Sequence, residues 1–269
     1  MRDSDAPIGI FDSGVGGLTV FHALERQLPR ESLIYLGDTA RIPYGTKSVA
    51  TIERYAAEDA AFVRSKQVKL IVIACNTASA LAAASVRRDS PVPVLGVIGP
   101  GAKRAVELSR SLKIGVIATE ATIGSRAYES RILEMSGDSE VFSRACPLFV
   151  PLAEEGWVDH AVTLQVAEEY LHELRSIPVD TLVLGCTHYP ILRPVIEQVM
   201  GDSVNYVDSG EAVASEVARV LETAGLARGH GDGRTEEFYV TDSPDRFRRV
   251  AERFLGRRIE MVETVRLGE

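Results

Sequence analysis

Short apolar runs rich in β-branched residues recur along this chain, and most of them lead into sequence with helical periodicity. The pattern is clearest in residues 68–77 and 179–188, which read VKLIVIACNT and VDTLVLGCTH. In each stretch, a buried-strand pattern ends in a small residue, a cysteine and a side chain that can hydrogen-bond. Helical sequence follows from Ala78 and from Pro190. This alternation predicts an α/β fold, with mainly parallel sheets covered by helices.

A second, weaker repeat indicates that the chain has two related halves. The segment IGIFDS at residues 8–13 resembles IGVIAT at residues 114–119, and each would be the opening strand of one half. We therefore expect two pseudo-symmetric domains, the first from residues 1–98 and 208–269 and the second from residues 99–207.

The alignment of the two halves brings Cys75 and Cys186 into register. Both cysteines would lie at the C-terminal end of a strand and beside the start of a helix. Open α/β sheets bind ligands at that edge, and a helix dipole there favours a thiolate. We expect the active site in the cleft between the domains, with one thiol on each wall.

Composition and charge narrow the class of protein. The 269 residues are 45% hydrophobic and 25% charged, which is ordinary for a globular protein, and the net charge is −8. With no basic cluster, the chain is expected to have no nucleic-acid partner. It shows neither a signal peptide nor an apolar stretch long enough to span a membrane, so we expect a cytoplasmic protein without a membrane partner. Its three cysteines include no Cys-x-x-Cys motif, which fits reduced thiols.

The turn after the first strand allows two interpretations. Residues 12–17, DSGVGG, lead into a helix whose N-terminus favours an anion, and glycines let the backbone approach a ligand. The spacing Gly14-x-Gly16-x-x-Thr19 is close to a dinucleotide fingerprint, but it lacks the third glycine or alanine. We favour a small anionic ligand and keep a nucleotide-binding module as the alternative.

Two matched thiols are compatible with a metal site, a redox pair, a nucleophile with a spare thiol, or two proton-transfer groups. Zinc needs three or four ligands, and nothing beside Cys75, Cys186 and His188 completes such a set. A redox pair needs sulfurs at bonding distance, which a sequence does not show. A nucleophile paired with His188 leaves Cys75 unexplained.

Proton transfer accounts for both thiols. Inverting a carbon centre requires a base on one face and an acid on the other, and a thiol pKa of about 8.5 makes both forms accessible. Asp12 and His188 are expected to be the polar partners of Cys75 and Cys186. We expect Cys146 to be a packed core residue and Glu154 and Glu155 to be solvated rather than catalytic.

Four motifs together resemble the bacterial glutamate racemases of the aspartate/glutamate racemase family: DSGVGG at 12–17, IPYG at 42–45, ACNT at 74–77 and GCTHYP at 185–190. The resemblance implies interconversion of L- and D-glutamate without cofactor or metal, which supplies D-glutamate for peptidoglycan. It also implies a homodimer. A racemase of the same family acting on aspartate or another amino acid is the alternative.

The same resemblance implies roles for single residues. Cys75 would take the proton from D-glutamate and Cys186 from L-glutamate, with Asp12 and His188 assisting them. The substrate contacts would be Asp12, Ser13, Pro43, Tyr44, Gly45, Asn76, Thr77, Thr119, Thr122, Thr187 and His188.

Overall fold

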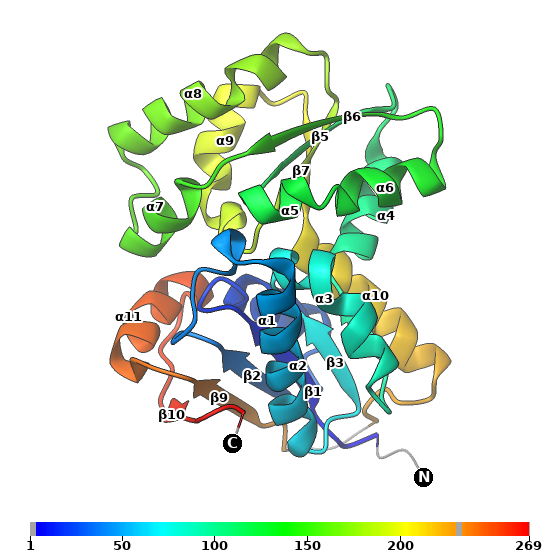
Figure 1. Ribbon diagram of the computed structural model, residues 1–269, viewed down its shortest axis with the longest axis vertical. Helices are drawn as coiled ribbons and strands as arrows, with labels where there is room; N and C mark the ends of the chain where they lie inside the picture. The colour runs from blue at the N-terminus through cyan, green and yellow to red at the C-terminus, as the bar shows by residue number, and fades with distance from the viewer. Residues whose placement is uncertain (1–3, 230–232, 269) are drawn as a thin grey trace.

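A computed structural model describes residues 4–229 and 233–268, and it contains two parallel β-sheets surrounded by helices (Figure 1). We call the part built on the six-stranded sheet the first domain. Its strands lie in the order β10-β9-β2-β1-β3-β4. They are β1 (Ile8–Asp12), β2 (Leu33–Gly37), β3 (Leu70–Ile73), β4 (Val94–Gly96), β9 (Glu236–Val240) and β10 (Glu263–Thr264).

The second domain is built on a four-stranded sheet in the order β6-β5-β7-β8. All of the described strand pairings in both sheets are parallel. The strands are β5 (Lys113–Ala118), β6 (Glu140–Ala145), β7 (Thr181–Gly185) and β8 (Asn205–Asp208).

The internal repeat of the sequence is also a repeat of strand order and register. The order β2-β1-β3-β4 in the first sheet recurs as β6-β5-β7-β8 in the second. Ile8 lies opposite Leu70 where β1 meets β3, and Ile114 lies opposite Thr181 where β5 meets β7. The sequence alignment equates these two pairs residue for residue. The predicted α/β fold with two pseudo-symmetric halves is therefore confirmed.

Helices cover the faces of both sheets (Figure 1). No helix in the described ranges is long and apolar enough to cross a membrane. The first domain carries α1 (Leu18–Gln27), α2 (Val49–Ser65), α3 (Asn76–Arg88), α10 (Ser209–Thr223), α11 (Pro244–Leu255) and the 3₁₀ helix η1 (Tyr44–Thr46). The second carries α4 (Ile98–Leu108), α5 (Glu120–Gly124), α6 (Ala127–Met135), α7 (Phe149–Glu155), α8 (Ala161–Ser176), α9 (Arg193–Met200) and the 3₁₀ helix η2 (Tyr189–Leu192).

The chain passes between the two domains twice, before α4 and before α10. Helix α4 packs on β7, β8 and α6 of the second domain, whereas α10 packs mainly on α1 of the first and also meets α4. Asp208 fixes the second crossing, because its side chain accepts hydrogen bonds from the backbone N–H groups of Gly210 and Glu211 at the start of α10.

Two elements differ from the pattern-based expectation. The sequence pattern predicts one helix from Thr122 to about Met135, but the structure has α5 and α6 there, because Arg126 adopts a left-handed backbone conformation with φ of 55°. The sequence pattern also predicts a last strand at residues 258–262, whereas the last strand of the structure is the two-residue β10 at Glu263–Thr264. After α11 ends at Leu255, the chain first buries Ile259 in the core and only then reaches the sheet edge.

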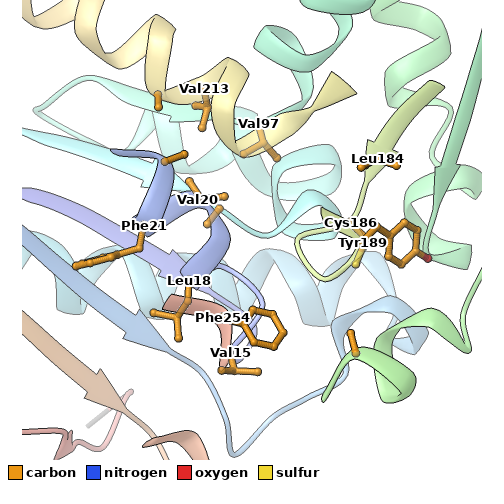
Figure 2. Close-up of a cluster of buried hydrophobic side chains, with 14 of the residues drawn as sticks. Val15, Leu18, Val20, Phe21, Val97, Leu184, Cys186, Tyr189, Val213 and Phe254 are labelled. Carbon is orange, nitrogen blue, oxygen red and sulfur yellow. The ribbon is translucent and has the colours of Figure 1, made fainter. Parts of the chain in front are cut away.

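A continuous apolar core crosses from one domain to the other (Figure 2). Val15, Leu18 and Phe254 of the first domain belong to the same buried cluster as Cys186 and Tyr189 of the second. The loop that follows β7 and carries Cys186, here called the Cys186 loop, therefore lies at the interface between the two domains.

Candidate active site

Cys75 lies where β3 passes into α3. Its Sγ accepts a hydrogen bond from the backbone N–H of Ala78 at 3.5 Å, so the thiol occupies the N-cap position of α3. Burial, together with the nearby Asp12 carboxylate, raises the pKa of the Cys75 thiol to about 12 and outweighs the Ala78 hydrogen bond. In the absence of a ligand, the Cys75 sulfur therefore holds its proton at neutral pH.

Cys186 directly follows β7, and its sulfur faces a histidine. Cys186 Sγ lies 3.8 Å from His188 Nδ1, and His188 Nε2 lies 3.2 Å from Glu154 Oε1. Burial alone would lower the pKa of His188, but hydrogen bonds with Cys186 and Glu154 outweigh it and raise the pKa to about 10. At neutral pH, the protonated ring therefore directs one N–H at the sulfur and the other at the carboxylate, which places a proton donor beside Cys186.

The expectation that Glu154 is solvated is wrong, although Glu155 is exposed as expected. The Glu154 side chain is only 15% exposed, and its Oε2 lies 3.1 Å from Arg246 Nη2. Burial would raise the pKa of Glu154, but the hydrogen bond from His188 and the charges of His188 and Arg246 hold it below its usual value. Sequence reasoning missed this residue because its partners are far away in the chain and no local motif marks it.

Asp12 is fully buried at the end of β1. Its Oδ2 accepts a hydrogen bond from the backbone N–H of Gly14 at 2.9 Å, and its Oδ1 has no hydrogen-bond partner among the described residues. Burial raises the pKa of Asp12, while the charge of His188 opposes this rise. The carboxylate therefore lies behind the site wall, where it influences Cys75 and His188 electrostatically.

The two thiols share one cavity of about 360 Å³. Among the expected substrate contacts, Asp12 and Thr122 do not line it. The expected residues that do are Ser13, Pro43, Tyr44, Gly45, Cys75, Asn76, Thr77, Thr119, Cys186, Thr187 and His188. Gly14, Ile42, Thr46, Glu120, Pro147, Val150, Pro151 and Glu154 complete the wall.

Three threonine hydroxyls form a closed cluster at the junction of the domains. Thr77 Oγ1 lies 3.0 Å from Thr119 Oγ1 and 3.1 Å from Thr122 Oγ1, and the last two are 3.0 Å apart. Thr77 and Thr119 reach the cavity, whereas Thr122 supports them from behind. Thr122 is thus placed to orient the two hydroxyls that can meet a ligand.

Two other wall residues are held by buried partners. Asn76 Oδ1 accepts a hydrogen bond from the Tyr128 hydroxyl at 2.7 Å. The Tyr44 hydroxyl lies within hydrogen-bond distance of the buried carboxyl groups of Asp38 and Asp59. The Asn76 side chain is thus held by Tyr128 of the second domain, and the Tyr44 side chain is held by Asp38 and Asp59 of the first.

The glycine loop before α1 meets the other domain at close range. A Cβ atom on Gly16 would lie 2.4 Å from the His188 ring and from Thr187 Oγ1. The Thr19 hydroxyl donates to the backbone carbonyl of Thr187 at 2.9 Å. The N-terminus of α1 is therefore covered by the Cys186 loop. This arrangement argues against the nucleotide interpretation, because a pyrophosphate would need the same space.

The cavity wall contains few cationic groups. Among its described lining residues there is no lysine or arginine, so hydroxyls, backbone N–H groups, the Asn76 amide and protonated His188 are the groups that can meet an anion. Within residues 4–229 and 233–268, no three His, Cys, Asp or Glu side chains are grouped so as to hold a metal ion.

Comparisons with known proteins identify the family of this chain. The family described as Asp/Glu/Hydantoin racemase matches residues 8–217. A relative named glutamate racemase, from Syntrophus aciditrophicus, is 51% identical over 261 residues, which cover 97% of each chain. The crystal structure of glutamate racemase from Francisella tularensis in complex with D-glutamate matches with a TM-score of 0.91 at 41% identity over 98% of each chain. The glutamate racemase from Thermus thermophilus in complex with β-chloro-D-alanine matches with a TM-score of 0.89 at 48% identity, again over 98% of each chain. The chain therefore belongs to the Asp/Glu/Hydantoin racemase family.

Proposed function

We propose that this protein interconverts L- and D-glutamate by moving protons between the α-carbon and two thiols. The observation that carries the proposal is the cavity that Cys75 and Cys186 share, each thiol coming from the equivalent strand end of one half. The substrate is assigned from the relatives, which are named for glutamate and include a complex with D-glutamate.

In the L-to-D direction, the Cys186 thiolate removes the α-proton, and the electron pair of the C–H bond stays on the α-carbon. The Cys75 thiol then delivers its proton to the opposite face. The reaction leaves Cys186 protonated and Cys75 as a thiolate, which is the state needed for the reverse direction. His188 can exchange a proton with Cys186, and Asp12 lies on the Cys75 side.

The α-hydrogen of an amino acid is very weakly acidic, so the developing negative charge must be stabilised. We assign this role to the backbone N–H groups at the start of α3 and to the hydroxyls of Ser13, Thr77 and Thr187, which surround the cavity. Closure of the domains would exclude water and strengthen these interactions. The proposed reaction uses neither a cofactor nor a metal.

The wider assignments belong to the same proposal. We propose that the D-glutamate supplies peptidoglycan synthesis in the cytoplasm and that the protein acts as a homodimer. We also propose domain boundaries at residues 1–98 with 208–269 and at residues 99–207. The division of the strands between the two sheets supports these boundaries.

Circular dichroism of purified protein with L-glutamate, without added cofactor, tests the function. We expect the signal to decay to zero, because the two enantiomers are equally stable. An unchanged signal at high enzyme concentration, together with tight nucleotide binding in calorimetry, would favour the nucleotide-binding module instead. A kcat/KM for aspartate above that for glutamate would make aspartate the substrate and leave the proposed two-thiol mechanism unchanged.

A further inference from the structure

Helix α11 belongs to the first domain, yet it contacts Glu154 and His188, the ion pair beside Cys186 in the second domain. Arg246 Nη2 lies 3.1 Å from Glu154 Oε2, and Arg253 Nη1 donates to the Glu154 backbone carbonyl at 3.1 Å. Phe254 packs edge-on against the His188 ring, with centroids 5.7 Å apart. Figure 1 shows α11 on the side of the first domain that faces α7. Because Arg246 and Arg253 are about two helical turns apart, one face of α11 makes both arginine contacts.

The Glu154 carboxylate is held at both of its oxygens. Oε1 pairs with His188, and Oε2 pairs with Arg246. The terminal torsion of a glutamate is broad, so a carboxylate held at one oxygen can turn away from its partner. The second contact, with Arg246, restricts this rotation and keeps Oε1 directed at His188 Nε2.

We propose that Arg246 is a positioning residue for the Cys186 half of the reaction, acting through Glu154 and His188. The inference rests on the proposed two-thiol mechanism. The series of contacts from Arg246 to Glu154, His188 and Cys186 begins in the first domain and ends in the second. The Glu154–His188 pair of the second domain is thus ordered by Arg246, a side chain of the first domain.

The electrostatics agree with this geometry. His188 and Arg246 together hold the pKa of the largely buried Glu154 below its usual value, against the effect of burial. Glu154 stays charged, and its charge in turn supports the protonated form of His188. The Arg246 side chain is 54% exposed. Its replacement therefore leaves the core intact.

Replacing Arg246 should impair removal of the α-proton from the L-enantiomer only, because that proton is taken by Cys186. Cys75 has different partners, at the start of α3 and near Asp12, and Arg246 touches none of them. Racemisation rates do not distinguish proton removal by Cys186 from proton removal by Cys75, because enantiomers have equal free energies and kcat/KM must be equal in both directions for any variant.

Elimination from β-chloroglutamate does distinguish the two proton removals. Removal of the α-proton forms the α,β double bond and expels chloride with the C–Cl electron pair, so only the abstracting thiol is needed.

The test compares Arg246→Gln, Arg246→Lys and a matched control, Arg249→Gln, on L- and D-β-chloroglutamate. Arg249 is exposed on the same helix and makes no described hydrogen bond or ion pair. We expect Arg246→Gln to slow elimination from the L-form about tenfold. This lies between the few-fold effect of an exposed ion pair and the 10²–10³ loss of a direct donor. The D-form should react at an unchanged rate, Arg246→Lys should recover most of the loss, and Arg249→Gln should have no effect.

Equal losses for both enantiomers, or no recovery with lysine, would overturn the proposal. Arg253→Gln removes the neighbouring contact to the Glu154 backbone but leaves the carboxylate contact. If it reproduced the L-specific loss, docking of α11 rather than Arg246 would be responsible. A double-mutant cycle of Arg246→Gln with Glu154→Gln is the second measurement, because residues acting through one another give non-additive losses. Additive losses would also overturn the proposal.

Failure of the proposed function would look different. The unmodified protein would then not racemise glutamate, or Cys186→Ser would still eliminate chloride from the L-form. Thermal unfolding of each variant confirms that the comparison is made between folded proteins.

Discussion

At the scale of single residues, the two thiols differ in their surroundings. Cys75 is buried at a helix start beside a buried carboxylate, and its pKa of about 12 keeps the proton on sulfur. Cys186 lies beside an imidazolium that can donate a proton to the sulfur. The site is therefore asymmetric in its chemistry although the fold around it is symmetric.

We expect Cys75→Ser and Cys186→Ser each to reduce racemisation to near background, because a serine hydroxyl has a far higher pKa than a thiol. Elimination from β-chloroglutamate should survive on one side only. Cys75→Ser should retain reaction of the L-form and lose that of the D-form, and Cys186→Ser should do the opposite. Chloride release measures both reactions.

The serine variants are matched to each other, since both replace one sulfur by oxygen at a buried strand end. Cys146→Ser is the control outside the cavity, because Cys146 is a buried core residue as expected. Similar losses on both enantiomers in both variants would point to one nucleophile and one structural thiol instead of two separate faces.

The charge of His188 should appear in the pH dependence of stability. Its pKa is raised from 6.5 to about 10, so the protonated ring stabilises the folded state. That contribution is fully present below pH 6.5 and is lost as the pH rises through about 10. We expect the difference in unfolding free energy between the unmodified protein and His188→Asn to shrink over this range. Urea unfolding at a series of pH values measures it, and a difference that stays constant between pH 6.5 and about 10 would mean that the folded ring is already neutral.

At the scale of elements, the close approach of the α1 loop to the Cys186 loop depends on one missing side chain. We expect Gly16→Ala to lower the unfolding free energy by about 1–3 kcal/mol, the usual effect of overpacking. Racemisation should fall at least about tenfold, because the new methyl group displaces His188 or Thr187. Thermal unfolding and the circular dichroism assay measure the two effects.

Gly124→Ala is the control for this change. Gly124 lies at the end of α5, and a Cβ atom there meets nothing within 4 Å. Alanine should therefore be neutral or stabilise the helix by up to about 1 kcal/mol, with activity unchanged. Full activity in Gly16→Ala would mean that the two loops do not approach as closely in solution.

The sequence predicts the strands of the site better than the helices around it. Residues 70–73 and 182–184 are continuous apolar runs, and burial on both faces of a parallel sheet imposes that pattern. The break at Arg126 has a weaker signal, since only Gly124 lies near it and a single glycine inside a helical pattern does not by itself end a helix. Glu154 was hidden for a related reason. Its role arises from the packing of α7 against α11 and His188, which joins residues 34 and 92 positions apart.

At the scale of the whole molecule, the repeat predicts more than a fold class. Because the two halves share strand order and register, the alignment of two ten-residue segments places both thiols at corresponding sheet edges. The alignment does not predict how the halves face each other. The core that runs from Leu18 through Phe254 to Cys186 fixes that arrangement. It is formed by side chains from both halves, whose contacts no single segment encodes.

The location of the cavity between the domains leads to the last prediction. Its wall combines the Pro43–Tyr44–Gly45 segment of the first domain with the Cys186–Thr187 loop of the second, and the chain passes between the domains before α4 and before α10. A ligand that contacts both walls binds a closed arrangement more tightly than an open one, so it shifts the population toward closure. We expect D-glutamate to reduce the radius of gyration in small-angle scattering and to increase hydrogen-exchange protection at residues 43–45 and at Thr187. The core strand β3 serves as the internal control, since its amides should already exchange slowly without ligand. An unchanged scattering envelope with unchanged protection in both loops would mean that the cavity is preformed and that substrate enters without domain motion.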